Sequence, residues 1–208
     1  MIIGSDKDKK KKKEKAAEAE APAPEEGAEE TNPMGALEQL LGGTQNEIRT
    51  IGLMGDVDEE KGGDLMMAIL LLTELSGKEA PYDPITMYIS TYGGAADEMF
   101  GIYDVMRFIK DGGISSITTC GIGKVMSAGV LLLAAGTKGK RRVGKHCRIM
   151  LHSVIGGSTG PMHQLENEFA EVKKIQDAYI KTLVEETNMT EKELRKLLKR
   201  KTNVYLSA

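Results

Sequence analysis

One serine of this chain, Ser127, lies in a segment rich in small residues, Gly121 to Gly129, that runs into the apolar segment from Val130 to Ala135. The pattern predicts a turn that presents Ser127 at the N-terminus of a helix. A serine placed there has an accessible hydroxyl, and the free N–H groups of the helix end can stabilise an anion. These are the requirements of a nucleophile for acyl transfer.

Two further segments have the residue types that such a nucleophile needs. A glycine pair, Gly93-Gly94, follows the strand-like run ITMYIS, and His152 ends the strand-like run RIMLH. Ligands of open α/β sheets bind beyond the carboxyl ends of the strands, so these segments should meet Ser127 at one edge. We therefore expect Ser127 to attack a carbonyl and His152 to accept its proton.

The same arrangement predicts where the negative charge of the reaction would be stabilised. The backbone N–H groups of Gly94 and Ala128 would hold the developing oxyanion.

Other polar candidates receive simpler interpretations. Lys124, three residues before the serine, would suit a Ser-Lys mechanism, but a solvated loop lysine is the favoured interpretation. His146 and His163 have no neighbouring nucleophile in the sequence, and we assign them no role. Cys120 and Cys147 lie far apart in apolar segments, which predicts buried, reduced thiols rather than a disulfide or a metal site.

Composition limits the class of protein. The 208 residues are 40% hydrophobic, which is enough for one substantial core and predicts one folded domain. A net charge of −3 argues against nucleic acid or an anionic membrane as the main partner. The chain has no apolar run of membrane-spanning length and no signal-peptide core, which predicts a cytoplasmic protein. Nothing in the sequence requires a cofactor or a metal.

The N-terminal residues 1–33 differ from the rest. A block of lysines is followed by glutamates interleaved with alanine and proline, without an aromatic residue. Such a segment buries too little apolar surface to offset its ordering entropy, which predicts a disordered charged tail. A docking arm is the alternative. Residues 34–47 are expected to form a linker or short helix, and residues 48–208 the folded domain.

From residue 48 the sequence alternates between strand and helix patterns, which predicts an α/β fold with right-handed crossovers and a largely parallel sheet. The helix at 64–75 is apolar on almost all sides, so we expect it to be buried. Residues 140–143 and 147–152 are expected to form a hairpin. The remaining expected strands are 49–54, 85–90 and 114–120, and the remaining expected helices are 95–110, 127–135, 162–186 and one beginning at Thr190 with Glu193 in a capping box.

Between residues 51 and 208 the sequence resembles the proteolytic subunit of the Clp protease, a serine peptidase of the crotonase-like superfamily. The resemblance rests on GKVMSAGVLLLAAGTKGKRRVGKHCRIMLH, on the GGSTG that follows, and on the terminal YLSA. It implies a crotonase-like fold of repeated β-α-β units with a protruding handle helix. It also implies Ser127 as nucleophile, His152 as base, and Gly94 and Ala128 as oxyanion donors, with Ala128 where the family usually has methionine.

The resemblance further implies an assembly. Members of this family stack two heptameric rings around a chamber that degrades unfolded polypeptides, and an AAA+ unfoldase, which uses the ATP, feeds the chamber. The helix at 162–186 would be the handle between the rings.

The sequence departs from the family at three points. Asn203 stands where the family has the aspartate of its triad, which predicts weaker catalysis because an amide can orient a histidine but adds no charge. Members of the family have an N-terminal hairpin that contacts the unfoldase, and this hairpin has no counterpart in the charged tail. The sequence ends at Ala208, before the last helix and strand expected for the family.

A catalytically weak or silent structural ring subunit and a crotonase-like acyl-CoA enzyme are the alternatives to a peptidase.

Overall fold

The computed structural model describes residues 48–74, 80–199 and 203–206. The predicted tail at 1–33 and the predicted linker or short helix at 34–47 therefore lie outside the described residues. Within the described part, the chain forms a single mixed α/β unit, as the alternating sequence pattern predicts, with a mostly parallel sheet. This arrangement is consistent with the crotonase-like fold expected from the sequence.

The sheet has six strands in the described residues, in the order β1-β2-β3-β5-β6, with β4 also paired to β3. All pairs are parallel except the antiparallel pair of β5 with β6. The strands are β1 (Thr50–Met54), β2 (Tyr82–Thr91), β3 (Ser115–Met126), β4 (Arg141–Val143), β5 (Arg148–Leu151) and β6 (Val204–Leu206).

The prediction of a hairpin from residues 140–143 and 147–152 was wrong. Both β4 and β5 pair in parallel with β3, through Thr119↔Arg141 and Lys124↔Arg148, so they follow one another along one edge of β3. The intervening turn keeps the chain direction, because Gly144 N–H donates to the Gly121 carbonyl as a continuation of the β4 ladder. The glycine between these two short strands therefore lies in a connection that keeps the direction of the chain, and not in a turn that reverses it.

Strand β3 is longer than its sequence suggests. It continues through the glycine-rich segment to Met126, because that segment pairs with β2 on one side and with β5 on the other. The predicted turn is thereby reduced to the single residue Ser127, and the helix α4 (Ala128–Ala134) begins directly after it, as expected.

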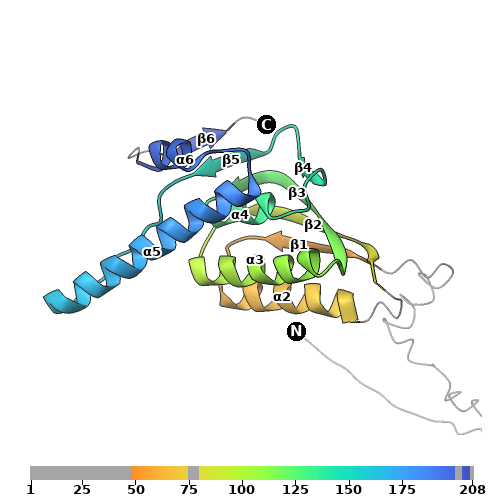
Figure 1. Ribbon diagram of the computed structural model, residues 1–208, viewed down its shortest axis with the longest axis horizontal. Coiled ribbons are helices and arrows are strands. Elements are labelled where there is room, and N and C mark those ends of the chain that lie inside the picture. Colours follow the sequence, from red (N-terminus) through yellow and green to blue (C-terminus); the bar gives the residue numbers. More distant parts are fainter. Residues whose placement is uncertain (1–47, 75–79, 200–202, 207–208) are drawn as a thin grey trace, which may run out of the picture. The chain divides into compact units, whose positions relative to one another are not determined.

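Helices α2 (Glu59–Glu74) and α3 (Ala96–Asp111) lie side by side along the sheet (Figure 1). Helix α2 begins earlier than expected, because the Asp58 side chain accepts the Lys61 N–H at 2.9 Å and caps it. It is also less buried than expected: Leu65 and Ile69 face the core, whereas the Met67 side chain is 54% exposed. One face of α2 packs against the fold, and on the opposite face Met67 and Leu71 are exposed among the residues that the structure describes.

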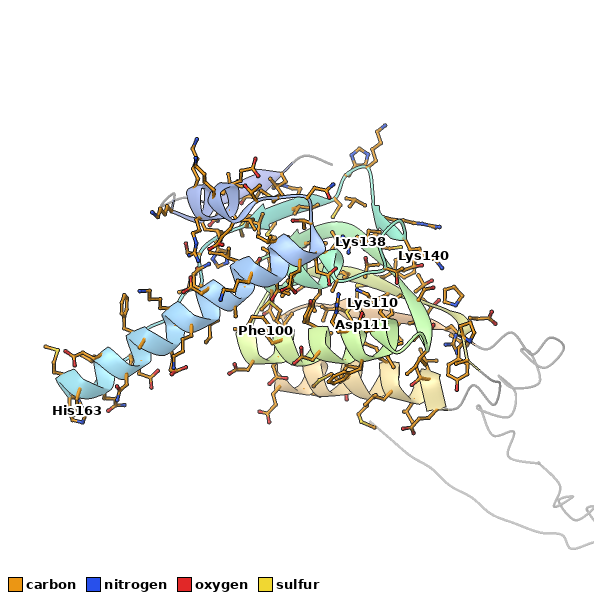
Figure 2. All side chains as sticks on the ribbon, in the orientation of Figure 1. Phe100, Lys110, Asp111, Lys138, Lys140 and His163 are labelled. Atoms are coloured by element: carbon orange, nitrogen blue, oxygen red, sulfur yellow. The ribbon has the colours of Figure 1, made fainter. Side chains whose placement is uncertain are left out.

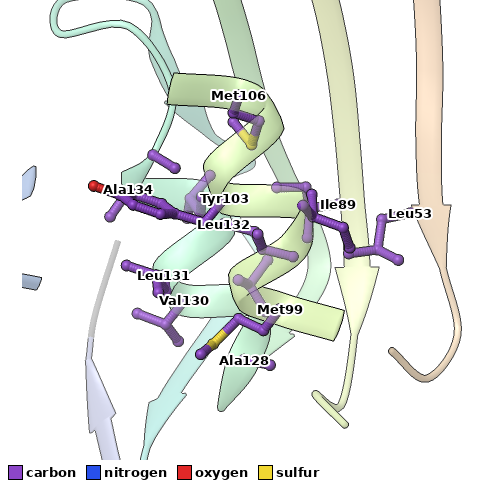
Figure 3. Packing of buried hydrophobic residues seen from close by; sticks show 14 of the residues in the cluster. Leu53, Ile89, Met99, Tyr103, Met106, Ala128, Val130, Leu131, Leu132 and Ala134 are labelled. Carbon is purple, nitrogen blue, oxygen red and sulfur yellow. The ribbon is translucent and has the colours of Figure 1, made fainter. Parts of the chain in front are cut away.

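The core lies between these helices and the sheet, with α4 at its centre. Figure 3 shows Leu131 and Leu132 of α4 in the same cluster as Met106 of α3 and Ile89 of β2. Cys120 and Cys147 are buried and unpaired, as predicted. None of the helices in the described segments has both the length and the hydropathy that crossing a bilayer requires.

Helix α5 (Met162–Glu186) has the predicted bounds, and its two halves differ. Its C-terminal half buries Tyr179, Ile180 and Leu183 in the core. Its N-terminal half projects away from the sheet (Figure 1), and Phe169 is 73% exposed there. The predicted capping box of Thr190 and Glu193 begins the short helix α6 (Glu191–Leu198).

The end of α5 carries a buried ionic cluster that the sequence analysis did not predict. Glu186 is 1% exposed, and its carboxylate accepts from Arg107 at 2.9 Å and from Arg141 at 2.8 Å. The Tyr103 hydroxyl donates to the same carboxylate at 3.2 Å, and the Lys110 ammonium lies 3.7 Å from it. Burial, reinforced by the charge of Glu186, raises the pKa of Tyr103 to about 12. The cluster joins α5 to α3 and β4.

Replacing Glu186 by alanine should strongly destabilise the fold, because it leaves several partly buried cations without their counter-charge. Removing one partner of a buried ion pair typically lowers the free energy of unfolding by about 3 to 5 kcal/mol. The control is Glu185→Ala at the exposed neighbouring position, which should change it by less than about 0.5 kcal/mol. Denaturant unfolding measures both, and equal losses would show that the cluster is not a stabilising element.

Candidate active site

Ser127 is the single residue between β3 and α4, and its backbone is held in an uncommon conformation. Its φ is 53° and its ψ is −119°, and among the described residues it is the only one other than glycine with a positive φ. Such a conformation costs of the order of 1–3 kcal/mol and persists only where the surroundings impose it.

Three hydrogen bonds impose this conformation. The Ser127 N–H donates to the Met150 carbonyl at 2.9 Å, in the strand that leads to His152. The Ser127 carbonyl accepts the Val130 N–H at 2.9 Å and the Tyr179 hydroxyl at 3.1 Å. The serine backbone is therefore tied to β5, to its own helix and to α5.

The glycine pair after β2 passes close to the serine because it has no side chains. A Cβ atom on Gly93 would lie 2.5 Å from the Ser127 Cβ, and one on Gly94 would lie 2.0 Å from the Val57 carbonyl oxygen. The hydrogen bonds around Gly94 use its neighbours: the Gly93 carbonyl accepts from Val57, and the Ala95 N–H donates to Val57. In this parallel bridge the Gly94 N–H points away from Val57.

A cavity of about 340 Å³ brings the predicted residues together. Ser127, His152, Gly94 and Ala128 all line it. The remaining walls are mostly apolar or aromatic: Tyr92, Ala95, Ala96, Met99, Val154, Ile155 and Tyr179. Four of the five predicted site residues, drawn from three separate segments, thus share one cavity.

The histidine is half-buried and its ring is oriented by the backbone. The Nδ1 atom of His152 lies 2.5 Å from the Ser153 carbonyl oxygen. A carbonyl can only accept, so a neutral ring carries its proton on Nδ1 and leaves Nε2 free to act as a base.

The segment after the histidine is fixed by two helices. The Ser153 hydroxyl donates to the Leu198 carbonyl in α6, and the Gln176 side chain in α5 accepts the Val154 N–H at 2.7 Å. These contacts hold the carbonyl that meets the histidine, and the sequence analysis did not predict them.

Asn203 lies just outside the cavity. The β5–β6 register pairs Leu151 with Val204, so His152 and Asn203 are the next residues along the two strands. The Asn203 side chain is exposed, and it is not among the described residues that line the cavity. Its predicted role as third member of the triad stays a prediction.

The other candidates lie elsewhere. Lys124 belongs to β3 and not to a loop, and its ammonium lies 4.6 Å from the centroid of the Tyr92 ring, a cation–π contact. His146 is exposed, and Figure 2 shows His163 at the projecting end of α5. Over the described segments, no three His, Cys, Asp or Glu side chains gather in a way that could hold a metal ion.

Tyr179 also lines the cavity, although it is not among the site residues predicted from the sequence. In the sequence it belongs to the apolar stripe of a long helix, and stripes of this kind predict core packing. Its one distinguishing signal is a hydroxyl among members that are otherwise aliphatic or phenylalanine.

Comparisons with known proteins identify relatives over most of this chain. The sequence model of the Clp protease family matches residues 40–208. The ATP-dependent Clp protease proteolytic subunit 3 of Nocardia farcinica is 33% identical over 172 residues, which cover 82% of this chain and 71% of that protein. Proteolytic subunit 2 of Corynebacterium jeikeium is 32% identical over 170 residues, with coverage of 81% and 74%. Proteolytic subunit 1 of Rhodococcus jostii is 33% identical over 171 residues, with coverage of 82% and 70%.

Proposed function

The chain belongs to the Clp protease family, and on that premise we propose that it is a serine endopeptidase subunit that hydrolyses peptide bonds of unfolded polypeptides in an oligomeric chamber. The observation that carries the proposal is the shared cavity, in which the strained Ser127 lies with His152 and the two backbone donors. The apolar walls of the cavity suit an apolar side chain of the substrate.

The proposed reaction uses only groups of this chain and water. The Ser127 Oγ attacks the substrate carbonyl while Nε2 of His152 takes its proton, and the N–H groups of Gly94 and Ala128 stabilise the oxyanion. His152 then protonates the leaving amine, and an acyl-enzyme forms on Ser127. Water, activated by His152, releases the acyl group and restores the serine. No cofactor or metal takes part in these steps.

The proposed partners follow from the family and from α5. The relatives are named as proteolytic subunits of ATP-dependent proteases, so we propose that an AAA+ unfoldase in the cytoplasm supplies the substrate and uses the ATP. The exposed Phe169 and Met162 on the projecting half of α5 favour self-association into a ring or a double ring, proposed to be heptameric.

A catalytically weak structural ring subunit is the second candidate, and Asn203 is the observation that favours it. A ring of such subunits would assemble without efficient hydrolysis, since the imidazolium formed during catalysis would lack a carboxylate partner.

Ser127→Ala tests the proposed function. The variant should fold and assemble as the parent does, but its peptide hydrolysis and its labelling by a fluorophosphonate probe should fall to background. Ser116→Ala, a serine bonded to Lys140 and outside the cavity, is the matched control and should be labelled at Ser127 at the parent rate.

Hydrolysis that persists in Ser127→Ala would overturn the peptidase proposal. An assembled parent without labelling would support the structural subunit, and acyl-CoA hydrolysis without labelling would support the crotonase-like alternative.

Phe169→Lys tests the assembly. A charged group at this exposed apolar position should disperse the rings, as measured by sedimentation or native mass spectrometry. Val172 is unsuitable for this test because it packs against Gly156, where a Cβ would meet it at 2.5 Å. Asn167→Lys, an exposed polar neighbour that gains the same charge, is the control and should leave the assembly intact. A strictly monomeric parent would contradict the proposal.

Asn203→Asp tests the third member of the proposed triad. A carboxylate beside the histidine should raise kcat and move the acidic limb of the pH–rate profile to higher pH, because it favours the charged, inactive form of the base in the free enzyme. The loss of about 10⁴-fold in trypsin, a known example of the reverse change, is an upper limit for the gain. Peptidase rates against pH should be compared at equal assembly. An unchanged rate and limb would exclude Asn203 from the site.

A further inference from the structure

The peptide group between Ser127 and Ala128 has two ends with different partners. Its carbonyl accepts the Tyr179 hydroxyl at 3.1 Å and the Val130 N–H at 2.9 Å. Its N–H belongs to Ala128, which is the first residue of α4 and lines the cavity. The same group that receives the tyrosine hydroxyl thus supplies one of the two proposed oxyanion donors.

The geometry of a peptide group links these two ends. The group is planar and normally trans, so its carbonyl and its N–H point in opposite directions. A hydrogen bond that fixes the carbonyl therefore fixes the direction of the N–H as well. Hydrogen bonds that share one peptide group also polarise it, which strengthens the donor end.

The surroundings of Tyr179 keep its hydroxyl in place and protonated, so that it can donate to the Ser127 carbonyl. Its side chain is 4% exposed, it lies in the anchored half of α5, and its ring forms part of the cavity wall. Burial raises the pKa of Tyr179 above its ordinary value, so the hydroxyl stays protonated and available as a donor throughout the pH range of an assay.

The hydrogen bond from Tyr179 also stabilises the uncommon backbone conformation of Ser127. A φ of 53° is unfavourable for a residue with a side chain. A bond to the serine carbonyl opposes relaxation to a more common conformation, which would turn the Ala128 N–H away from its direction.

We propose that Tyr179 is a positioning residue for catalysis: its hydroxyl orients and polarises the Ser127–Ala128 peptide group and so holds the Ala128 N–H in place for the oxyanion. The inference rests on the proposed peptidase function. Tyr179 acts through the peptide group and makes no bond to the reacting atoms.

Tyr179→Phe removes only the hydroxyl and is the central test. Loss of an entire oxyanion donor lowers kcat by about 10²–10³-fold, so loosening one donor should lower kcat by about 10- to 100-fold. KM should stay within about twofold, because the donor acts mainly on the transition state. The limbs of the pH–rate profile should not move, since the hydroxyl does not titrate there.

Tyr103→Phe is the matched control. Tyr103 is a second buried tyrosine, and its hydroxyl bonds to Glu186 instead of to the serine. This variant should lose thermal stability and keep kcat. Both variants are measured as assembled full-length protein, at a temperature at which circular dichroism shows them folded. Tyr179→Met, which also lacks the donor, is the second variant if the phenylalanine variant does not fold, and it should show the same loss of kcat.

The outcomes separate the inference from the proposed function. If the parent is labelled by the fluorophosphonate probe and Tyr179→Phe keeps the parent kcat, the inference is wrong and the peptidase proposal stands. If kcat falls equally in Tyr179→Phe and Tyr103→Phe, the tyrosine has only a structural role and the inference is also wrong. If Ser127→Ala still hydrolyses peptides, the proposed function itself fails.

Discussion

The structure depends on one constraint, which is that the chain passes from β3 into α4 within a single residue. A strand and a helix joined so abruptly require a positive φ at Ser127, and three hydrogen bonds hold it there. The neighbouring backbone must also come close. A Cβ on Gly93 would lie 2.5 Å from the serine Cβ, and one on Gly129 would lie 2.4 Å from Thr91. Close packing of the backbone therefore already requires glycine at these positions, whatever reaction the site performs.

Helix α5 connects this constraint to the rest of the fold. Tyr179 and Glu186 lie seven residues apart, which is two helical turns, so they share one face of the helix. The first bonds to the Ser127 carbonyl, and the second is held by Arg107 and Arg141. The C-terminal half of α5 is therefore fixed at both ends by polar contacts in a buried setting. The N-terminal half can project, with Phe169 exposed, without loosening the site.

Local patterns in the sequence were enough to predict the α/β class, the bounds of α5 and the meeting of Ser127 with His152, because hydrophobic periodicity and parallel strand order determine them. They failed where distant pairing decides the structure. The glycines before Met126 suggest a turn, yet pairing on both edges makes them a strand. Glu186 looks like a solvated charge until the fold surrounds it with cations, and the hydroxyl of Tyr179 has no visible partner in a linear sequence.

The contact of the His152 ring with the Ser153 carbonyl supplies one of the two roles that a triad carboxylate usually has. A carboxylate fixes the tautomer of the histidine and also stabilises the positive charge that forms on it. Here the Ser153 carbonyl already faces Nδ1, so the tautomer does not require Asn203. A carbonyl carries only a partial negative charge, so the electrostatic part is reduced. If the peptidase proposal holds, a site of this kind keeps a correctly oriented base while giving up charge stabilisation, and the backbone donors at Gly94 and Ala128 then carry a larger share of the transition-state stabilisation.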